Sequence, residues 1–314
     1  MYYSTEKILL LILGLFLAGA ATIAVTGFRN TSSTSVSELW RLYNTEWLIV
    51  AGVIIPAYLG GIYFLLAVLV FNFRSHIEIA HIHMKKVTST WVLISLILST
   101  CILYIFSISE NQLPLVIWIQ LATVGIYLLI LAILFICKLK QYIYSLFLTS
   151  LVILSLSGLL FINNMENGLL LIIFLFVISE TNDAFALVFG KIIGKRKALS
   201  TISPHKTVEG LIFGILFSAS AGFLYNYFIL GYPLPVIVPV VILVITSAIA
   251  GDIVFSAYKR CHKIKDFKAV INGQGGVLDI YDSLLVASLV FYTTLVCMHG
   301  FEWLIDNSTI IHLD

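Results

Sequence analysis

Residues 235–260 read PVIVPVVILVITSAIAGDIVFSAYKR, and this stretch carries no charged residue before Asp252. Its apolar part is uninterrupted and does not alternate with polar residues, so it predicts a membrane-spanning helix rather than a barrel strand. The polar residues near its end are spaced so that they share one helix face: Asp252, Ser256, Lys259 and Arg260. The stretch therefore predicts a helix that crosses the hydrocarbon and ends in a charged face.

Similar apolar runs fill the rest of the chain. Of its 314 residues, 60% are hydrophobic and 11% are charged, and the mean hydropathy is +1.05. Soluble globular proteins have about 25% charged residues, so this composition excludes a soluble globular domain. Backbone polar groups find no water in hydrocarbon, which favours helices. We expect an all-α polytopic integral membrane protein in a lipid bilayer, without a nucleic-acid partner.

The apolar runs predict about nine transmembrane helices. The second run is long, and a polar loop at 72–90 is predicted to follow it. The predicted spans are 7–27, 47–71, 91–109, 113–137, 142–162, 168–188, 208–230, 235–256 and 283–303.

Lysine and arginine are concentrated in alternate loops. Only Arg29 and Arg41 interrupt this alternation. Because cytoplasmic loops carry the excess of these residues, we expect a cytoplasmic N-terminus, an outer C-terminus and a charged face on the cytoplasmic side. The short N-terminus favours a bacterial plasma membrane. The basic loops are 72–90, 138–141, 189–207 and 257–282.

The acidic residues divide the chain lengthwise. Before residue 170 the predicted spans hold almost no ionisable residues, whereas Glu180, Asp183, Glu209 and Asp252 lie in or at the ends of later spans. Acidic residues within membrane segments are costly and usually functional. We therefore expect N-terminal transmembrane helices at 1–167 and a C-terminal catalytic region at 168–314.

Three polar blocks of this region, at 179–197, 203–210 and 251–282, combine carboxylates, basic residues and glycines. Carboxylates can hold a divalent cation that bridges phosphates, while lysine and arginine neutralise the remaining charge. Oxygen ligands beside a nucleotide favour Mg²⁺. The pattern thus indicates an enzyme acting on a phosphate-bearing substrate. The alternative from the residues alone is a set of structural ion pairs and a basic surface for anionic headgroups.

The order and spacing of these blocks resemble the phosphatidate cytidylyltransferase (CDP-diacylglycerol synthase) family. SPHKTVEG at 203–210 matches the family's SPxKTxEG, GDIVFSAYKR at 251–260 matches its GDLxxSxxKR, and NDAFALVFGKIIGK at 182–195 is similar to a third segment. The resemblance covers about residues 179–290. The family's C-terminal signature is matched without insertion or deletion by Ser256, Lys259-Arg260, Lys265-Asp266, Gly275-Gly276, Asp279 and Asp282.

The resemblance implies that CTP and phosphatidate give CDP-diacylglycerol and pyrophosphate, with Mg²⁺ as cofactor and a homodimer as the assembly. It implies catalytic roles for Asp252, Lys259, Asp266, Asp279 and Asp282. Metal contacts are expected from Asp183, Asp252, Asp266, Asp279 and Asp282. Substrate contacts are expected from Ser203, Lys206, Thr207, Ser256, Arg260, Lys265, Gln274, Gly275 and Gly276, beside those of Lys259.

The chain departs from the family pattern at three positions. Gln274 replaces the family's histidine, Ile280 replaces its arginine, and Lys268 replaces a small residue. Glutamine cannot gain charge near neutral pH, and isoleucine lacks the bidentate grip of arginine. Two alternatives therefore stay open: a cytidylyltransferase for another lipid phosphate, and a catalytically impaired homologue that binds lipid or nucleotide.

Overall fold

A computed structural model describes Gly14, Trp40 and residues 49–83, 99–101, 103, 140–165, 167–199, 202–268 and 275–310. The chain divides by its contacts into two compact units. One unit comprises Met1–Leu59 and Leu169–Ala287, and the other comprises Gly60–Gly168 and Ser288–Asp314. The expected division at residue 167 into a transmembrane part and a catalytic part stays a prediction.

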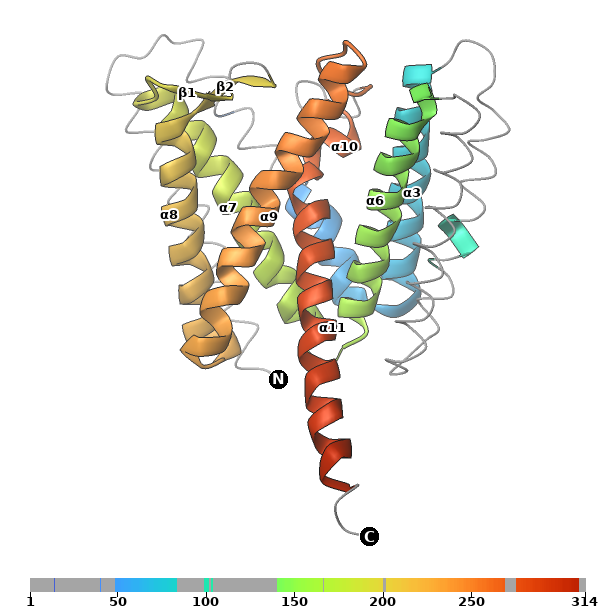
Figure 1. Cartoon of the computed structure of the whole chain (residues 1–314), viewed down its shortest axis with the longest axis vertical. Coiled ribbons are helices and arrows are strands. Elements are labelled where there is room, and N and C mark those ends of the chain that lie inside the picture. Colours follow the sequence, from blue (N-terminus) through green and yellow to red (C-terminus); the bar gives the residue numbers. More distant parts are fainter. Residues whose placement is uncertain are drawn as a thin grey trace. The chain divides into compact units, whose positions relative to one another are not determined.

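The described part of the chain is mostly helical, as expected. A helix at Ile49–Leu59 precedes the labelled elements of Figure 1. These are α3 (Gly61–His83), α6 (Lys140–Asn163), α7 (Gly168–Ile192), β1 (Lys197–Leu199), β2 (Ser203–Thr207), α8 (Val208–Tyr225), the π-helix η1 (Asn226–Leu230), α9 (Leu234–Cys261), α10 (Val277–Ile280) and α11 (Asp282–Ile310).

Five of the described helices are long and apolar enough to cross a membrane. They include 168–192, 208–230 and 234–261, which confirms three of the predicted spans within a few residues. The predicted spans at 7–27, 91–109 and 113–137 lie outside the described residues, apart from a few positions. The chain is thus an integral membrane protein, whereas nine helices and the orientation of the termini stay predictions.

The single span predicted at 47–71 is wrong, and so is the part of the predicted loop 72–90 that the structure describes, residues 72–83. The helix ends at Leu59, Gly60 and Gly61 take φ values of +63° and +46°, and α3 then continues to His83. Both values lie in the left-handed region, which glycine adopts without strain. Polar side chains extend α3 because they find partners along it: the His76 ring hydrogen-bonds the Asn72 carbonyl at 2.8 Å.

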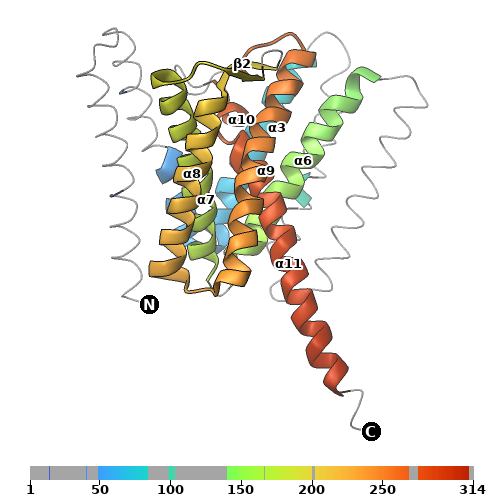
Figure 2. The same ribbon diagram turned by 60° about the vertical axis from the view of Figure 1, so that its left-hand side comes forward.

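A two-stranded sheet was also not expected. β1 and β2 pair antiparallel, with Lys197 opposite Thr207 and Leu199 opposite Ser203. Figures 1 and 2 show this hairpin at the end of α7 and α8 that is remote from the turn joining α8 to α9. The hairpin therefore lies at the same end as the charged end of α9.

The two units have separate apolar cores. In the first unit, Ile178, Tyr225, Val244, Phe255 and Leu278 are buried, and the Tyr225 hydroxyl donates to the Leu170 carbonyl at 2.9 Å.

In the second unit, Leu148, Val152 and Ile153 of α6 are fully buried. The rings of Phe161 and Tyr292 meet edge to face at 5.2 Å between centroids. Each core is built from the apolar faces of long helices.

Candidate active site

Several charged residues of the first unit gather where α7, β2, α9, α10 and the first turn of α11 meet. Helix α9 contributes Asp252, Ser256 and Lys259 from three successive turns. The Ser256 hydroxyl donates to Asp252 Oδ1 at 3.2 Å. Lys259, whose side chain is 9% exposed, donates to Asp279 Oδ1 at 2.6 Å. Of the four residues predicted to share one face of α9, these three lie together, whereas Arg260 donates to the Ile202 carbonyl oxygen and lies apart from them.

Lys206 reaches this face from β2. Its Nζ forms an ion pair with Asp252 Oδ2, and both side chains are 22% exposed. The pair connects the hairpin directly to α9. Its partial exposure leaves room for solvent or a ligand to reach both charges.

Three carboxylates, those of Asp183, Asp252 and Asp282, lie close enough for their charges to interact. Asp183 accepts a hydrogen bond from Asn182 Nδ2 at 3.2 Å, and the Ser283 hydroxyl donates to Asp282 Oδ1 at 3.4 Å. Asp282 begins α11, and its Oδ1 accepts from the Ser283 N–H at 2.7 Å. The charges of Lys206 and Lys259 also act on Asp282. Three acids and two lysines thus form one polar cluster.

A glycine brings two of these acids together. A Cβ placed on Gly251 would lie 2.5 Å from the Asp282 carbonyl oxygen and 3.1 Å from Ser283 Cα. Only glycine allows α9 to pass so close to the first turn of α11. Because Asp252 follows Gly251 directly, this contact sets its position relative to Asp282.

Asp279 is occupied by three donors. Besides Lys259, its Oδ2 accepts from the backbone N–H groups of Phe267, at 2.7 Å, and Gly276, at 2.9 Å. Gly275 takes a φ of +88°, and a Cβ there would collide with the same carboxylate. Asp279 therefore holds the glycine turn and the ammonium of Lys259 in place. This is a positioning geometry, and direct contact of Asp279 with metal stays a prediction.

The start of α8 is organised by hydrogen bonds to backbone groups. Thr207 Oγ1 accepts from the Gly210 N–H at 3.1 Å and caps the helix. Glu209 Oε2 accepts from the N–H groups of Lys195, at 3.0 Å, and Arg196, at 3.2 Å. These bonds fix the turn between α7 and β1, and thereby the hairpin that carries Lys206. Thr207 acts here as a cap, and its expected substrate contact stays a prediction.

Other predicted site residues lie apart from the cluster. Arg260 is exposed and donates to the carbonyl oxygens of Ile202, at 3.1 Å, and Ile264, at 3.0 Å. Lys265 and Asp266 are exposed. Ser203 pairs with Leu199 in the hairpin. Gln274 lies outside the described residues.

Sequence reasoning missed two residues of the cluster, Asn182 and Ser283. Asn182 directly precedes Asp183, and Ser283 directly follows Asp282, and both are buried at 2% and 3% exposure. The signal that could have found them is a small polar residue beside an acid in an apolar helix. Such a residue usually has a hydrogen-bonding role, because a buried polar group without a partner is costly.

The donors suit Mg²⁺ better than a transition metal. Carboxylate and hydroxyl oxygens are hard ligands, which Mg²⁺ prefers. Among the described residues, no three acidic, histidine or cysteine side chains form a ready-made metal site. Mg²⁺ is nevertheless usually held by one or two carboxylates together with waters and substrate phosphates. Asp252 and its two acidic neighbours fit that kind of site.

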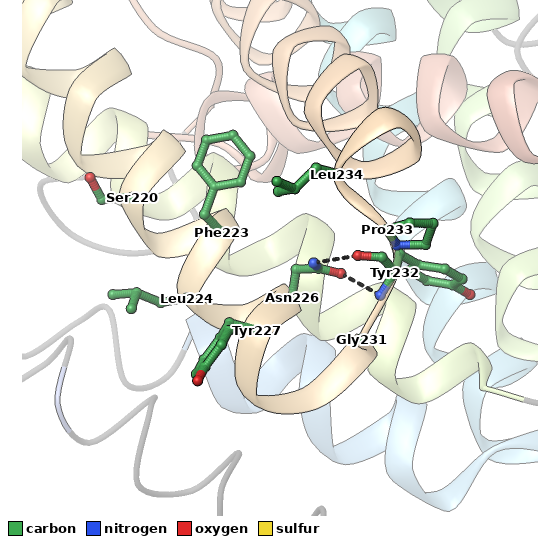
Figure 3. Close-up of a pocket in the computed structure, with 9 residues that line it drawn as sticks. All are labelled: Ser220, Phe223, Leu224, Asn226, Tyr227, Gly231, Tyr232, Pro233 and Leu234. Atoms are coloured by element: carbon green, nitrogen blue, oxygen red, sulfur yellow. Dashed lines mark hydrogen bonds between the residues drawn. The ribbon is translucent and has the colours of Figure 1, made fainter.

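An apolar pocket lies at the opposite end of α8 and α9 (Figure 3). Phe223, Tyr232 and Leu234 help to line it. The Asn226 side chain donates to the Tyr232 carbonyl at 2.9 Å and accepts from the Tyr232 N–H at 3.0 Å, which closes the turn between the helices. None of the residues that line the pocket carries a charged side chain.

Known proteins resemble this chain over part of its length. Residues 40–298 match the family described as "Cytidylyltransferase family". The uncharacterized protein YnbB of Escherichia coli (strain K12) is 35% identical over 131 residues, which are 41% of this chain and 43% of YnbB. A phosphatidate cytidylyltransferase of Staphylococcus epidermidis is 35% identical over 126 residues, or 40% of this chain and 48% of that protein. One from Staphylococcus aureus (strain COL) is 33% identical over 126 residues, again 40% and 48%. The chain spans less than half the length of each of these relatives.

Proposed function

Since the chain belongs to the cytidylyltransferase family, with a match over residues 40–298, we propose that it transfers a cytidylyl group from CTP to phosphatidate. The products are CDP-diacylglycerol and pyrophosphate, and the role is a step of phospholipid biosynthesis. Relatives from two staphylococci carry the name phosphatidate cytidylyltransferase. Because the matched regions cover less than half of those proteins, the substrates are part of the proposal.

The observation that carries the proposal is the cluster of three acids and two lysines. Asp183, Asp252 and Asp282 interact electrostatically with one another and with Lys206, and Lys259 lies within the same network. Buried charges of both signs are costly unless each has a partner. In a membrane protein such a cluster usually marks the place of function. A nucleoside triphosphate and a lipid phosphate bring the negative charge that two lysines can neutralise.

In the proposed reaction, an oxygen of the lipid phosphate attacks the α-phosphorus of CTP. A new phosphorus–oxygen bond forms, the bond from the α-phosphorus to its bridging oxygen breaks, and pyrophosphate leaves with the electron pair. Positioning and charge stabilisation supply most of the rate enhancement in such transfers. Lys206 and Lys259 would contact the phosphates. Each lysine would then share its ammonium group between a phosphate oxygen and its present partner, Asp252 for Lys206 and Asp279 for Lys259.

We further propose that Mg²⁺ binds at Asp252, with Asp183 and Asp282 as neighbouring oxygen donors. A bound Mg²⁺ supplies positive charge that offsets the charge of the triphosphate and of the leaving pyrophosphate. Lys206 forms an ion pair with Asp252, so this carboxylate has a positively charged partner within the protein.

The localisation and assembly belong to the same proposal. The site lies at the basic end of α9, which we assign to the cytoplasmic side of a bacterial inner membrane. CTP is available on that side, and phosphatidate is supplied from the bilayer. A homodimer is the assembly proposed from the family resemblance.

The proposal is tested with purified protein in detergent, CTP, Mg²⁺ and short-chain phosphatidate. We expect pyrophosphate release that depends on both substrates. Asp282→Asn should lower kcat by roughly 100-fold, a size typical for loss of one group that stabilises transition-state charge. Absence of CTP-dependent turnover with wild-type protein would sink the proposed reaction.

Ile280 and Gln274 favour a second candidate, in which the acceptor is another lipid phosphate. Ile280 lies in α10 and directly follows Asp279, whose carboxylate pairs with Lys259. The family pattern has an arginine at this position, and an arginine there could bind phosphate. A panel of lipid phosphates, compared by kcat/KM, separates the two candidates. Clear preference for phosphatidate eliminates the second one. Nucleotide or lipid binding without turnover on any acceptor would instead identify an impaired homologue.

A further inference from the structure

Asn182 is a buried polar residue that no part of the proposed chemistry uses directly. It lies just before Asp183 on α7 and is 2% exposed. Its Nδ2 donates to Asp183 Oδ1 at 3.2 Å. Its Oδ1 is buried without a hydrogen-bond partner among the described residues. The amide thus has one used donor and one unused acceptor.

The unused oxygen lies in the contact between α7 and α8. A Cβ on Gly214 would be 3.0 Å from Asn182 Oδ1 and 2.8 Å from the Asn182 carbonyl oxygen. The glycine therefore makes the space in which the amide fits. A buried oxygen without a donor is unfavourable. A leucine has a similar shape and would fill the same contact without burying an unpaired polar atom. Helix packing alone does not account for asparagine at this position.

What asparagine provides and leucine cannot is the hydrogen bond to Asp183. The charge of the same carboxylate interacts with that of Asp252. The Ser283 hydroxyl of α11 donates instead to Asp282 Oδ1, at 3.4 Å. Groups that orient a metal-binding carboxylate typically contribute about 10- to 100-fold to metal affinity.

We propose that Asn182 is a positioning residue that fixes the Asp183 carboxylate for the divalent cation of the cluster. This inference rests on the proposed function, because it assigns Asn182 a role in the cation site named there. Asn182 itself touches neither the cation nor the substrate.

The test measures Mn²⁺ binding without substrate, by electron paramagnetic resonance titration of purified protein. Mn²⁺ suits the same oxygen ligands as Mg²⁺. We expect Asn182→Leu to weaken Mn²⁺ binding by about 10-fold, while its melting temperature without metal stays equal or rises. Asn182→Ala serves as a second variant that cannot clash with α8 and should weaken binding to a similar extent.

Ser179→Ala is the matched control. Ser179 lies on the same helix, is fully buried, and its Oγ also has no partner among the described residues. Its removal should leave Mn²⁺ affinity unchanged. If both Asn182 variants bind Mn²⁺ with an affinity within twofold of the wild-type value, the positioning role is overturned and the proposed function stays intact. Wild-type protein that binds no Mn²⁺ overturns the cation site and this role together.

Discussion

Replacing Gly251 by alanine should separate the two helices that form the site. The new Cβ would lie 2.5 Å from the Asp282 carbonyl oxygen, 3.0 Å from Val286 Cβ and 3.1 Å from Ser283 Cα. Favourable contacts between non-bonded heavy atoms lie near 3.5 Å or above. Helix α9 must therefore move by roughly 1 Å relative to the first turn of α11. The movement changes the separation of Asp252 and Asp282.

The expected effect has two parts. Overpacking of this kind costs about 1–3 kcal/mol of stability, so the melting temperature should fall. A displacement of about 1 Å in a catalytic group can lower the rate by about 100-fold. We expect kcat for pyrophosphate release to fall by about that factor, and the fraction of folded protein at the assay temperature to remain high.

The control is Gly52→Ala in the helix at Ile49–Leu59. Its Cβ would meet only the Tyr281 hydroxyl, at 3.4 Å, which is an ordinary contact. Alanine also favours a helix interior over glycine by up to about 1 kcal/mol. This variant should keep its kcat and its stability. If Gly251→Ala shows wild-type kcat and melting temperature, the contact between α9 and α11 does not set the geometry of the site.

Three further predictions concern the surroundings of the cluster. Lys206→Ala removes the partner of Asp252 and a proposed phosphate contact, so kcat/KM for CTP should fall roughly 10-fold or more, as for loss of a charged hydrogen bond; an unchanged value in initial-rate assays would contradict this role. Glu209→Gln weakens the bonds that fix the turn before β1, and trypsin should cleave that turn faster than in wild-type protein; equal cleavage rates in limited proteolysis would show that the clamp is dispensable. Gly275→Ala forces a φ of +88° on a residue with a Cβ and displaces the Asp279 carboxylate. We expect a loss of about 1–3 kcal/mol in stability, and an unaltered melting temperature would argue against strain at this turn.

The membrane helices of the C-terminal half were predictable because hydrocarbon thickness fixes their length. The span predicted at 208–230 matches α8 and η1 to the residue. The match to the family confirms the family resemblance drawn from three short motifs. The second span failed because hydropathy averaged over a window does not register two glycines in left-handed conformation at Gly60 and Gly61. The hairpin was not predicted because strands of three and five residues are too short to show a periodic pattern in the sequence.

The site was predictable only along single helices. Helical periodicity placed Asp252, Ser256, Lys259 and Arg260 on one face, and the structure brings the first three together but leaves Arg260 apart. The approach of Asp282 to Asp252 depends on a tertiary contact at Gly251, which no spacing within either helix encodes. The three donors to Asp279 likewise come from separate parts of the chain.

The length of α9 couples the site to the thickness of the bilayer. At a rise of about 1.5 Å per residue, Asp252 lies about 27 Å along the axis from Leu234, and Lys259 lies about 38 Å from it. The hydrocarbon core is about 30 Å thick. A few ångströms of mismatch therefore decide whether the acid lies in the acyl chains or among the headgroups. Turnover should therefore depend on the acyl-chain length of the host membrane, and under the proposed function the protein would respond to the thickness of the membrane that its proposed product helps to build.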